Sequence, residues 1–299
     1  MNIGLIGFGE VGGILATDLK ARGADVAAWD LLMAQPAMRE KARAAGIEAC
    51  ESSAALVRRS QVVISAVTAS NTLAAAREAA QAIGRGTFFL DLNSASPGTK
   101  QSCAQAIDAA GGHYVEAGVM TSLPPYRIKV PMVVGGARAP ELIEKLAPYG
   151  FAMEFVSESL GVASAIKMCR SVMIKGLEAI FIESYSTARR YGVEERVLES
   201  FKETFPNFQW EKEGAYFFSR VVQHGKRRAE EMREAAVTVR EAGFDPFMAA
   251  ATAEKQDQVA KLAAKGVFAG LAPGADWREY ADRLIRENAP SAQDRKKSA

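Results

Sequence analysis

The sequence predicts the α/β fold class: a doubly wound, mostly parallel sheet, followed by an all-α C-terminal domain that a long helix joins to it. Two observations predict this. In residues 1–150, short apolar runs alternate with helix-like stretches, which is typical of parallel strands with helical crossovers. Past Gly150, one more apolar run at 151–156 is followed almost entirely by helix-like sequence, beginning with the proline-free stretch 164–191.

The predicted strands are short, because turn residues or helix-like stretches bound each apolar run. Residues 2–6 and 25–30 are the first two, and an alanine-rich helical stretch at 72–83 separates the next two. In a sheet of this kind, ligands bind beyond the carboxyl ends of the strands. The residues directly after each run are therefore the functional candidates. The later runs are 61–67, 87–92, 113–117 and 129–134.

A glycine-rich turn follows the first strand directly and predicts a dinucleotide site. Gly7 permits the tight strand-to-helix turn, Gly9 lets bare backbone approach a pyrophosphate, and Gly12 lets the helix lie close to the strand. The helix N-terminus offers N–H groups and a positive dipole end to the phosphates. The first domain is therefore expected to be Rossmann-like. Cofactor contacts are expected from this turn and from the end of the third run: Gly7, Phe8, Gly9, Glu10, Val11, Gly12, Val67 and Thr68.

An acidic residue, Asp30, ends the second strand. Its carboxylate is expected to accept hydrogen bonds from the adenosine ribose hydroxyls, and its charge would repel a 2′-phosphate. The sequence therefore predicts NAD as the cofactor in preference to NADP.

Composition fits a two-domain enzyme and excludes several other classes. The chain has 299 residues, 48% of them hydrophobic, which is enough for two buried cores. Its 37 basic and 35 acidic side chains leave a formal charge of +2, so we expect no nucleic-acid or membrane partner. Three cysteines and two histidines show no disulfide or zinc pattern. We expect no metal site and a reducing, cytoplasmic location.

The change of pattern after the sheet predicts the domain organisation. Residues 1–160 are expected to form the NAD-binding domain, 161–290 a helical substrate and dimerisation domain, and 291–299 a flexible polar tail. A helix over 164–191 would be about 42 Å long at 1.5 Å per residue, longer than one compact domain requires. We therefore expect it to join the domains and to contribute to a homodimer interface.

Polar residues follow the fourth run, in the segment 91–98. At the carboxyl edge of the sheet, Asn93 and Ser94 would lie beside the nicotinamide ring and a polar substrate. Asn93 is therefore a candidate for both cofactor and substrate binding. Ser96 before Pro97 is a standard helix start, and the alternative for Ser96 is an N-cap without further function.

Four segments together resemble the signature motifs of the β-hydroxyacid dehydrogenase family, which includes 3-hydroxyisobutyrate and 6-phosphogluconate dehydrogenases. They are residues 7–12, 91–97, 116–121 and 161–167, in the family's order and spacing. The resemblance implies NAD(P)-dependent oxidation of a small β-hydroxy acid or similar alcohol, by a Rossmann-like domain with a dimerising helical domain. The C-terminal half resembles that of poorly characterised 6-phosphogluconate-dehydrogenase-like proteins.

By the same resemblance, Lys167 is the catalytic lysine. It would take the hydroxyl proton while hydride leaves the carbinol carbon, as a general base does. Partial burial beside Arg170 and the cationic nicotinamide would favour a neutral amine. The alternative is a solvated helix face, because Lys167, Ser171, Lys175 and Glu178 recur at helical spacing. The candidate substrate contacts are Asn93, Ser94, Thr121, Ser122, Arg170 and Ser171.

The chain departs from the family at informative places. The third motif normally ends Ser-Gly-Gly, whereas here Thr121 and Ser122 precede Leu-Pro-Pro, so neither the substrate nor the direction and stereochemistry of transfer follows from a relative. Ile174 stands where decarboxylating sugar-phosphate enzymes carry a glutamate, which argues against 6-phosphogluconate chemistry.

A charged segment at 224–232 is a second candidate cluster. Arg227 or Arg228 could bind a substrate carboxylate bidentately, or the run could be a solvated helix face. Relatives carry a lysine where Glu230 stands.

Two rival functions stay open. An imine reductase resembles this chain, but that group usually prefers NADPH and replaces the lysine, so Asp30 and Lys167 count against it. The altered third motif and Glu230 motivate the second rival, a nucleotide-binding sensor that has lost catalysis.

Overall fold

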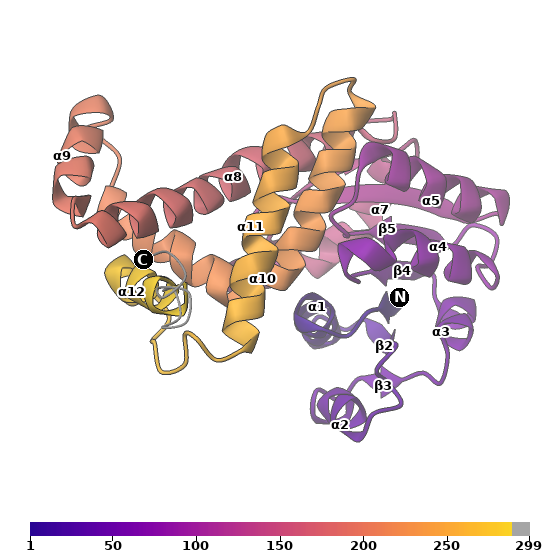
Figure 1. Ribbon diagram of the computed structural model, residues 1–299. Helices are drawn as coiled ribbons and strands as arrows, with labels where there is room; N and C mark the ends of the chain where they lie inside the picture. The colour runs from indigo at the N-terminus through magenta and orange to yellow at the C-terminus, as the bar shows by residue number, and fades with distance from the viewer. Residues whose placement is uncertain (289–299) are drawn as a thin grey trace, which may run out of the picture. The chain divides into compact units, whose positions relative to one another are not determined.

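The computed structural model describes residues 1–288, drawn in colour in Figure 1, and the predicted tail at 291–299 lies outside them. The chain divides into two compact units. The first, the sheet unit, comprises Met1–Arg170 and Glu234–Asp245. The second, the helical unit, comprises Ser171–Arg233 and the described residues from Pro246 onward. The division falls inside two long helices, whereas the sequence indicated one boundary between 160 and 161.

The sheet unit contains one eight-stranded sheet, in the order β3-β2-β1-β4-β5-β6-β7-β8. Neighbouring strands are parallel except β6 and β7, whose antiparallel register places Glu116 opposite Gly135. The predicted mostly parallel, Rossmann-like sheet is therefore confirmed. The strands are β1 (Asn2–Ile6), β2 (Asp25–Trp29), β3 (Glu48–Ala49), β4 (Val62–Ser65), β5 (Phe88–Asp91), β6 (His113–Val119), β7 (Pro131–Gly135) and β8 (Ala152–Ser157).

Helices cover both faces of the sheet, because alternate strand residues point to opposite faces. In β4, Val62 and Ile64 join the core on one face, and Val63 joins the core on the other. The first core includes side chains of α1 (Glu10–Ala21), α2 (Pro36–Ala44), α6 (Leu123–Tyr126) and α7 (Ala139–Leu146). The second includes side chains of α3 (Ser53–Arg59), α4 (Thr72–Ala80) and α5 (Pro97–Ala109), and Figure 1 shows α4 and α5 side by side.

The helical unit has an aromatic core. Phe181 stacks on Trp210 at a centroid distance of 5.5 Å and meets the edge of Phe217 at 4.9 Å, while Tyr185 meets Trp277 at 4.7 Å. Most of the aromatic run 201–218 therefore packs in a core. The helices are α8 (Val162–Tyr191), which begins in the sheet unit, α9 (Glu194–Thr204), α10 (Trp210–Glu241), α11 (Phe247–Ala264) and α12 (Trp277–Glu287).

Glycines end the two longest helices as the sequence indicated. Gly192 has φ +68° just after α8, and Gly243 has φ +87° just after α10, a conformation that side chains rarely adopt. The predicted long helix is present as α8. No helix within residues 1–288 combines the length and the apolar composition that crossing a bilayer requires.

Candidate functional site

The glycine turn between β1 and α1 has the geometry that dinucleotide binding needs. Gly7 has φ +93°, and a Cβ there would meet the carbonyl oxygen of Ala66 at 2.4 Å. A Cβ on Gly12 would lie 1.9 Å from the Gly7 carbonyl oxygen, so only glycine lets α1 cross the turn this closely. Around Gly9, the N-cap residue of α1, no described heavy atom lies within 4 Å of a Cβ position. The turn therefore presents bare backbone and a helix N-terminus to an anion.

Asp30 holds this turn from the end of β2. Its Oδ2 accepts a hydrogen bond from the Phe8 N–H at 2.7 Å, and its Oδ1 accepts one from the Leu32 N–H at 2.9 Å. The Phe8 ring is buried in the sheet core, so Phe8 offers only its backbone to the turn. A carboxylate has about four lone-pair positions, so Asp30 can still accept from a ribose hydroxyl.

Lys41 of α2 also lies at the turn, and the sequence interpretation missed it. Its Nζ donates to the carbonyl oxygens of Phe8 and Gly9, both at 2.8 Å, and lies 5.1 Å from the Phe8 ring centroid. This places a positive charge beside the backbone where phosphates would bind. No sequence signal marks Lys41, because its position depends on how α2 packs.

Asn93 is buried and links two loops at the carboxyl edge of the sheet. Its Oδ1 accepts from the Val67 N–H at 2.7 Å, and its Nδ2 donates to Ser65 Oγ at 3.0 Å. Its own N–H donates to Asp91 Oδ1 at 2.9 Å. Asn93 therefore ties the end of β4 to the end of β5. Ser94 is half-buried and is the more accessible of the two predicted substrate contacts.

A buried ion pair supports the loop that contains Asn93. Asp91 and Lys100 are at most 1% exposed, and Lys100 Nζ lies 3.0 Å from Asp91 Oδ1. The Tyr114 hydroxyl donates to Asp91 Oδ2 at 2.7 Å, and burial together with the Asp91 charge raises the pKa of Tyr114 well above its usual value of 10. The shape of the loop thus depends on Asp91, whose partners Lys100 and Tyr114 come from α5 and β6.

Ser96 is an N-cap of α5, as the alternative interpretation had it. Its Oγ accepts from the Thr99 N–H at 3.2 Å, and its own N–H donates to Glu234 Oε2 at 2.7 Å. The Ser96 hydroxyl donates to Glu241 Oε1 at 2.9 Å, and the Gly98 N–H donates to Glu241 Oε2 at 3.1 Å. Two carboxylates from the end of α10 therefore complete the start of α5 within the sheet unit.

Glu116 of β6 caps the start of α8. Its Oε1 accepts from the Gly161 N–H at 2.7 Å and the Ala163 N–H at 3.1 Å, and its Oε2 accepts from the Ser164 N–H at 3.3 Å. The Glu116 side chain is fully buried, and this burial raises its pKa although Lys100 and the three N–H groups oppose it. The first turn of α8 is thus fixed to the sheet.

Lys167 lies one turn further along α8 and is half-buried. Gly118, near the end of β6, has no side chain to separate them: a Cβ there would be 3.0 Å from Lys167 Cβ and 3.1 Å from the Ala163 carbonyl oxygen. Because that position is glycine, α8 lies directly on β6. Lys167 therefore belongs to the same compact unit as the glycine turn.

Most of the predicted site residues follow strand ends at one edge of the sheet. The strands β1, β4, β5 and β6 are consecutive and parallel, so the segments after them emerge on one side. After these strands come Gly7 to Gly12, then Val67 (half-buried) and Thr68 (exposed), then Asn93 and Ser94, and then Thr121 and Ser122, both half-buried.

Among residues 1–288, no three His, Cys, Asp or Glu side chains gather where a metal ion could bind.

Arg170 and Ser171 lie on either side of the division between the units. Arg170 is exposed at the end of the sheet unit. Ser171 is buried in the helical unit, where its Oγ accepts from Lys175 Nζ at 3.0 Å. Lys175 in turn lies 2.8 Å from Glu231 Oε2.

A solvated helix face was the alternative for the row that contains Lys175 and for the segment 224–232, and it is wrong for the residues named here. Ser171, Lys175 and Glu178 are buried, so the spacing that they share with Lys167 does not mark a wet face. Arg228 is buried as well and forms an ion pair with Glu178, its Nε donating at 2.8 Å. Helical spacing alone could not reveal this, because the partners come from different helices.

Two family descriptions match the chain. The NAD binding domain of 6-phosphogluconate dehydrogenase matches residues 2–147, and a domain of unknown function, DUF1932, matches residues 188–259. Among curated proteins, an uncharacterised 28.5 kDa protein in the 7S RNA 5′ region of Methanothermus fervidus is 30% identical over 256 residues, covering 83% of this chain and 94% of the relative.

Two solved structures are similar to this chain over most of its length. A conserved hypothetical protein from Sinorhizobium meliloti is 40% identical, with 96% of each chain covered and a TM-score of 0.74. A conserved protein of unknown function, described as structurally similar to 3-hydroxyacid dehydrogenases, is 34% identical, with 88% of this chain and 99% of that one covered and a TM-score of 0.68.

Two more distant structures share the fold. Mycobacterium tuberculosis 3-hydroxyisobutyrate dehydrogenase with L-serine is 16% identical, with 95% and 98% of the chains covered and a TM-score of 0.66. A reductive aminase from Aspergillus terreus in complex with NADPH is 18% identical, with 95% and 99% covered and a TM-score of 0.56.

Proposed function

Because the chain belongs to the β-hydroxyacid dehydrogenase family, with the NAD-binding domain of 6-phosphogluconate dehydrogenase and a DUF1932 domain, we propose that it is an NAD-dependent oxidoreductase. Its reaction is hydride transfer between nicotinamide and a β-hydroxy acid or related small alcohol. The observation that most supports this proposal is the position of Lys167. Because residue 118 is glycine, Lys167 lies against β6, in the same unit as the glycine turn.

The residues of the turn fit a nicotinamide dinucleotide. Gly9 gives the pyrophosphate open backbone, and the Lys41 ammonium adds positive charge at the same turn. Asp30 is the acceptor for the ribose hydroxyls, and its charge favours NAD. Val67, Thr68 and Asn93 follow the neighbouring strands, on the nicotinamide side. When bound, the nicotinamide accepts or supplies the hydride.

The chain's own residues move the proton and orient the substrate. Lys167 takes the proton from the substrate hydroxyl in oxidation, and in the reverse direction its ammonium returns it. Ser94 and Thr121, half-buried after β5 and β6, hold the substrate's polar groups by hydrogen bonds. Glu116 positions Lys167 by fixing the first turn of α8.

Turnover of a β-hydroxy-acid panel with NAD tests this proposal, with absorbance of the reduced nicotinamide as the readout. Lys167→Ala should lower kcat/KM by about 10²- to 10⁴-fold, the usual contribution of a general base, and leave NAD affinity unchanged in calorimetry. Lys129→Ala, an exposed lysine of the same unit, is the matched control. An unchanged rate in Lys167→Ala removes the assigned role, and tighter binding of NADP than of NAD removes the cofactor choice.

Imine reduction is the second candidate, because a reductive aminase shares the fold. Cyclic imines with NADH and NADPH distinguish the two reactions: turnover of imines without turnover of any hydroxy acid would replace the first proposal. NAD binding without turnover of any alcohol, aldehyde or imine would instead indicate a nucleotide sensor.

A further inference from the structure

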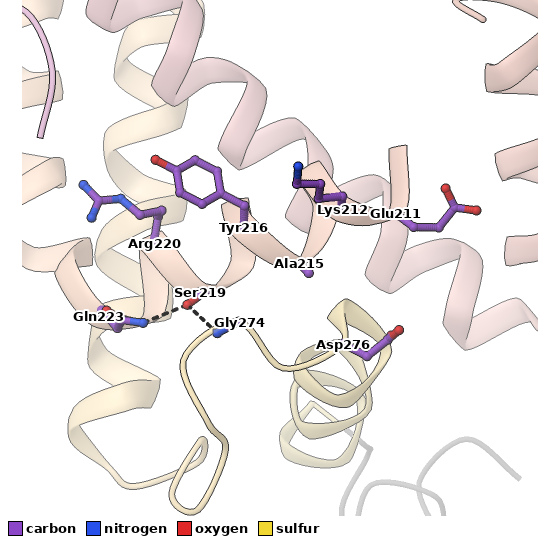
Figure 2. Close-up of a pocket in the computed structure, with 9 residues that line it drawn as sticks. All are labelled: Glu211, Lys212, Ala215, Tyr216, Ser219, Arg220, Gln223, Gly274 and Asp276. Carbon is purple, nitrogen blue, oxygen red and sulfur yellow. Dashed lines mark hydrogen bonds between the residues drawn. The ribbon is translucent and has the colours of Figure 1, made fainter. Parts of the chain in front are cut away.

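The helical unit contains a hollow of about 720 Å³ that the proposed reaction does not use. It lies along the first half of α10 and the loop before α12, and Figure 2 shows the side chains that line it. Its polar and aromatic lining includes Lys212, Tyr216, Ser219 and Arg220. All of them belong to the helical unit.

Two acidic and two basic side chains line the hollow, but the acids are already engaged with other residues. Glu211 is already paired with Lys202, whose Nζ lies 2.7 Å from its Oε1. Asp276 caps α12 by accepting from the Arg278 N–H at 2.8 Å. In the part of the chain that the structure describes, neither Lys212 nor Arg220 forms an ion pair. Since Asp276 also pairs with Arg278 at 3.5 Å, the two cations of the hollow are left without a carboxylate partner among the described residues.

Arg220 is the more constrained of these two cations. It is half-buried, and its guanidinium carbon lies 6.0 Å from the centroid of the Tyr216 ring. Figure 2 shows the two side chains beside each other. Burial lowers the pKa of Arg220, and the neighbouring Arg228 lowers it further. The buried acid whose charge acts on Arg220, Glu178, already accepts from Arg228 and from Gln256. A bound anion would compensate the charge of Arg220.

Ser219 adds a hydrogen-bond donor. Its Oγ accepts from Gln223 Nε2 at 2.7 Å and from the Gly274 N–H at 3.2 Å, the two dashed lines in Figure 2. No acceptor for its own hydroxyl hydrogen lies among residues 1–288. A hydroxyl that accepts twice in this way can still donate once, to a ligand oxygen.

We propose that this hollow binds a small organic carboxylate: the Arg220 guanidinium holds the carboxylate group, the Tyr216 ring beside it packs against the ligand's apolar part, and the Ser219 hydroxyl, which faces Gly274, donates to a second polar group where the ligand has one. The planar guanidinium fork matches a carboxylate bidentately. The half-exposed aromatic ring favours an organic anion over inorganic phosphate. This site does not depend on the proposed reaction, because none of its residues belongs to the sheet unit.

Calorimetric titration of the full-length protein with sodium benzoate, without nucleotide and at constant ionic strength, tests the site. Wild type should bind benzoate saturably. Arg220→Gln should weaken binding about tenfold or more, the loss of one charge-assisted contact. Ser219→Ala should leave the affinity for benzoate within about twofold, because benzoate has no second polar group. Lys226→Gln removes an exposed cation of the same helix outside the hollow, and should stay within about twofold of wild type.

A second measurement separates binding from folding. Without ligand, Arg220→Gln should melt at the same temperature as wild type or higher, because it removes a desolvated charge beside Arg228. Lower stability without ligand would make Arg220 a structural residue and overturn the proposal. So would the absence of benzoate binding to wild type, equal affinities of wild type and Arg220→Gln, or tighter binding of inorganic phosphate than of benzoate.

Discussion

Each unit of the molecule contains a buried glutamate, and the two charges are compensated in different ways. In the sheet unit, Glu116 receives three backbone N–H groups at the start of α8. In the helical unit, side chains of different helices pair directly, as Glu178 does with Arg228. Backbone donors have fixed positions once a helix starts, whereas pairs between helices depend on packing. We expect the helical unit to be more sensitive to the loss of a single partner.

The largest effect should come from Glu178→Ala. It leaves Arg228 buried without its carboxylate, so the free energy of unfolding should fall by about 3–5 kcal/mol. Urea unfolding followed by tryptophan fluorescence measures this, since Trp210 and Trp277 belong to the helical core. Glu183→Ala on the same helix is the control: its carboxylate is 69% exposed beside Lys255, and its loss should cost less than about 1 kcal/mol. Equal losses in the two variants would contradict the comparison.

Gly12→Ala tests a backbone contact of the sheet unit, the close approach of α1 to the glycine turn. The new Cβ would lie 1.9 Å from the Gly7 carbonyl oxygen, so α1 must shift away from the turn. We expect a loss of about 1–3 kcal/mol in stability and at least about tenfold in NAD affinity. Gly13→Ala is the neighbouring control, since its Cβ meets only the flexible end of Lys41 at 3.4 Å. If NADH fluorescence titration gives both variants the same affinity, the close crossing of α1 is not what forms the site.

Glu116→Gln tests how much the Glu116 carboxylate stabilises the start of α8. A carboxamide oxygen can accept only part of the three N–H bonds, so we expect about 1–2 kcal/mol lower stability and faster hydrogen exchange over 161–167. Because Lys167 lies on this turn, its rate of acylation, measured by mass spectrometry against pH, should change as well. Glu154→Gln on exposed β8 is the control. Unchanged exchange at 161–167 would show that the cap is dispensable.

The smallest effect concerns acid stability. Burial pulls the pKa of Asp18 up, but hydrogen bonds from Arg127 and the Ile128 N–H outweigh it, so the pKa lies below the usual 3.8. A depressed carboxyl pKa adds stability above the unfolded pKa, and this is lost as pH falls through the folded pKa.

Asp18→Asn should therefore cost about 1 kcal/mol or less at pH 7, since Arg127 is half exposed, and the difference from wild type should vanish below about pH 3. Urea midpoints between pH 2 and pH 7 provide the measurement, with exposed Asp25→Asn as the control. A cost that persists at the acid end would point to packing instead of ionisation.

Several elements were predictable because their signals are local. The glycine turn, the short apolar strands and the Ser96 cap each depend on neighbouring residues, and the structure has them where the sequence indicated. Lys41 and Glu116 were not identified as supports of the site, because their partners are distant in sequence. The burial of Lys175 and Glu178 was equally hidden, since helical spacing gives the same pattern for a wet face and for a buried polar row.

The sequence by itself determined the strands other than the two-residue β3, the glycine turn and the length of α8, because backbone conformation and hydrophobic pattern are set over a few residues. Only the tertiary structure decided that the start of α8, with Lys167, belongs to the sheet unit, that the end of α10 joins it, and that Arg220 lacks an acidic partner among the described residues. Each of these depends on which distant segments meet, and burial then fixes which charges must be paired.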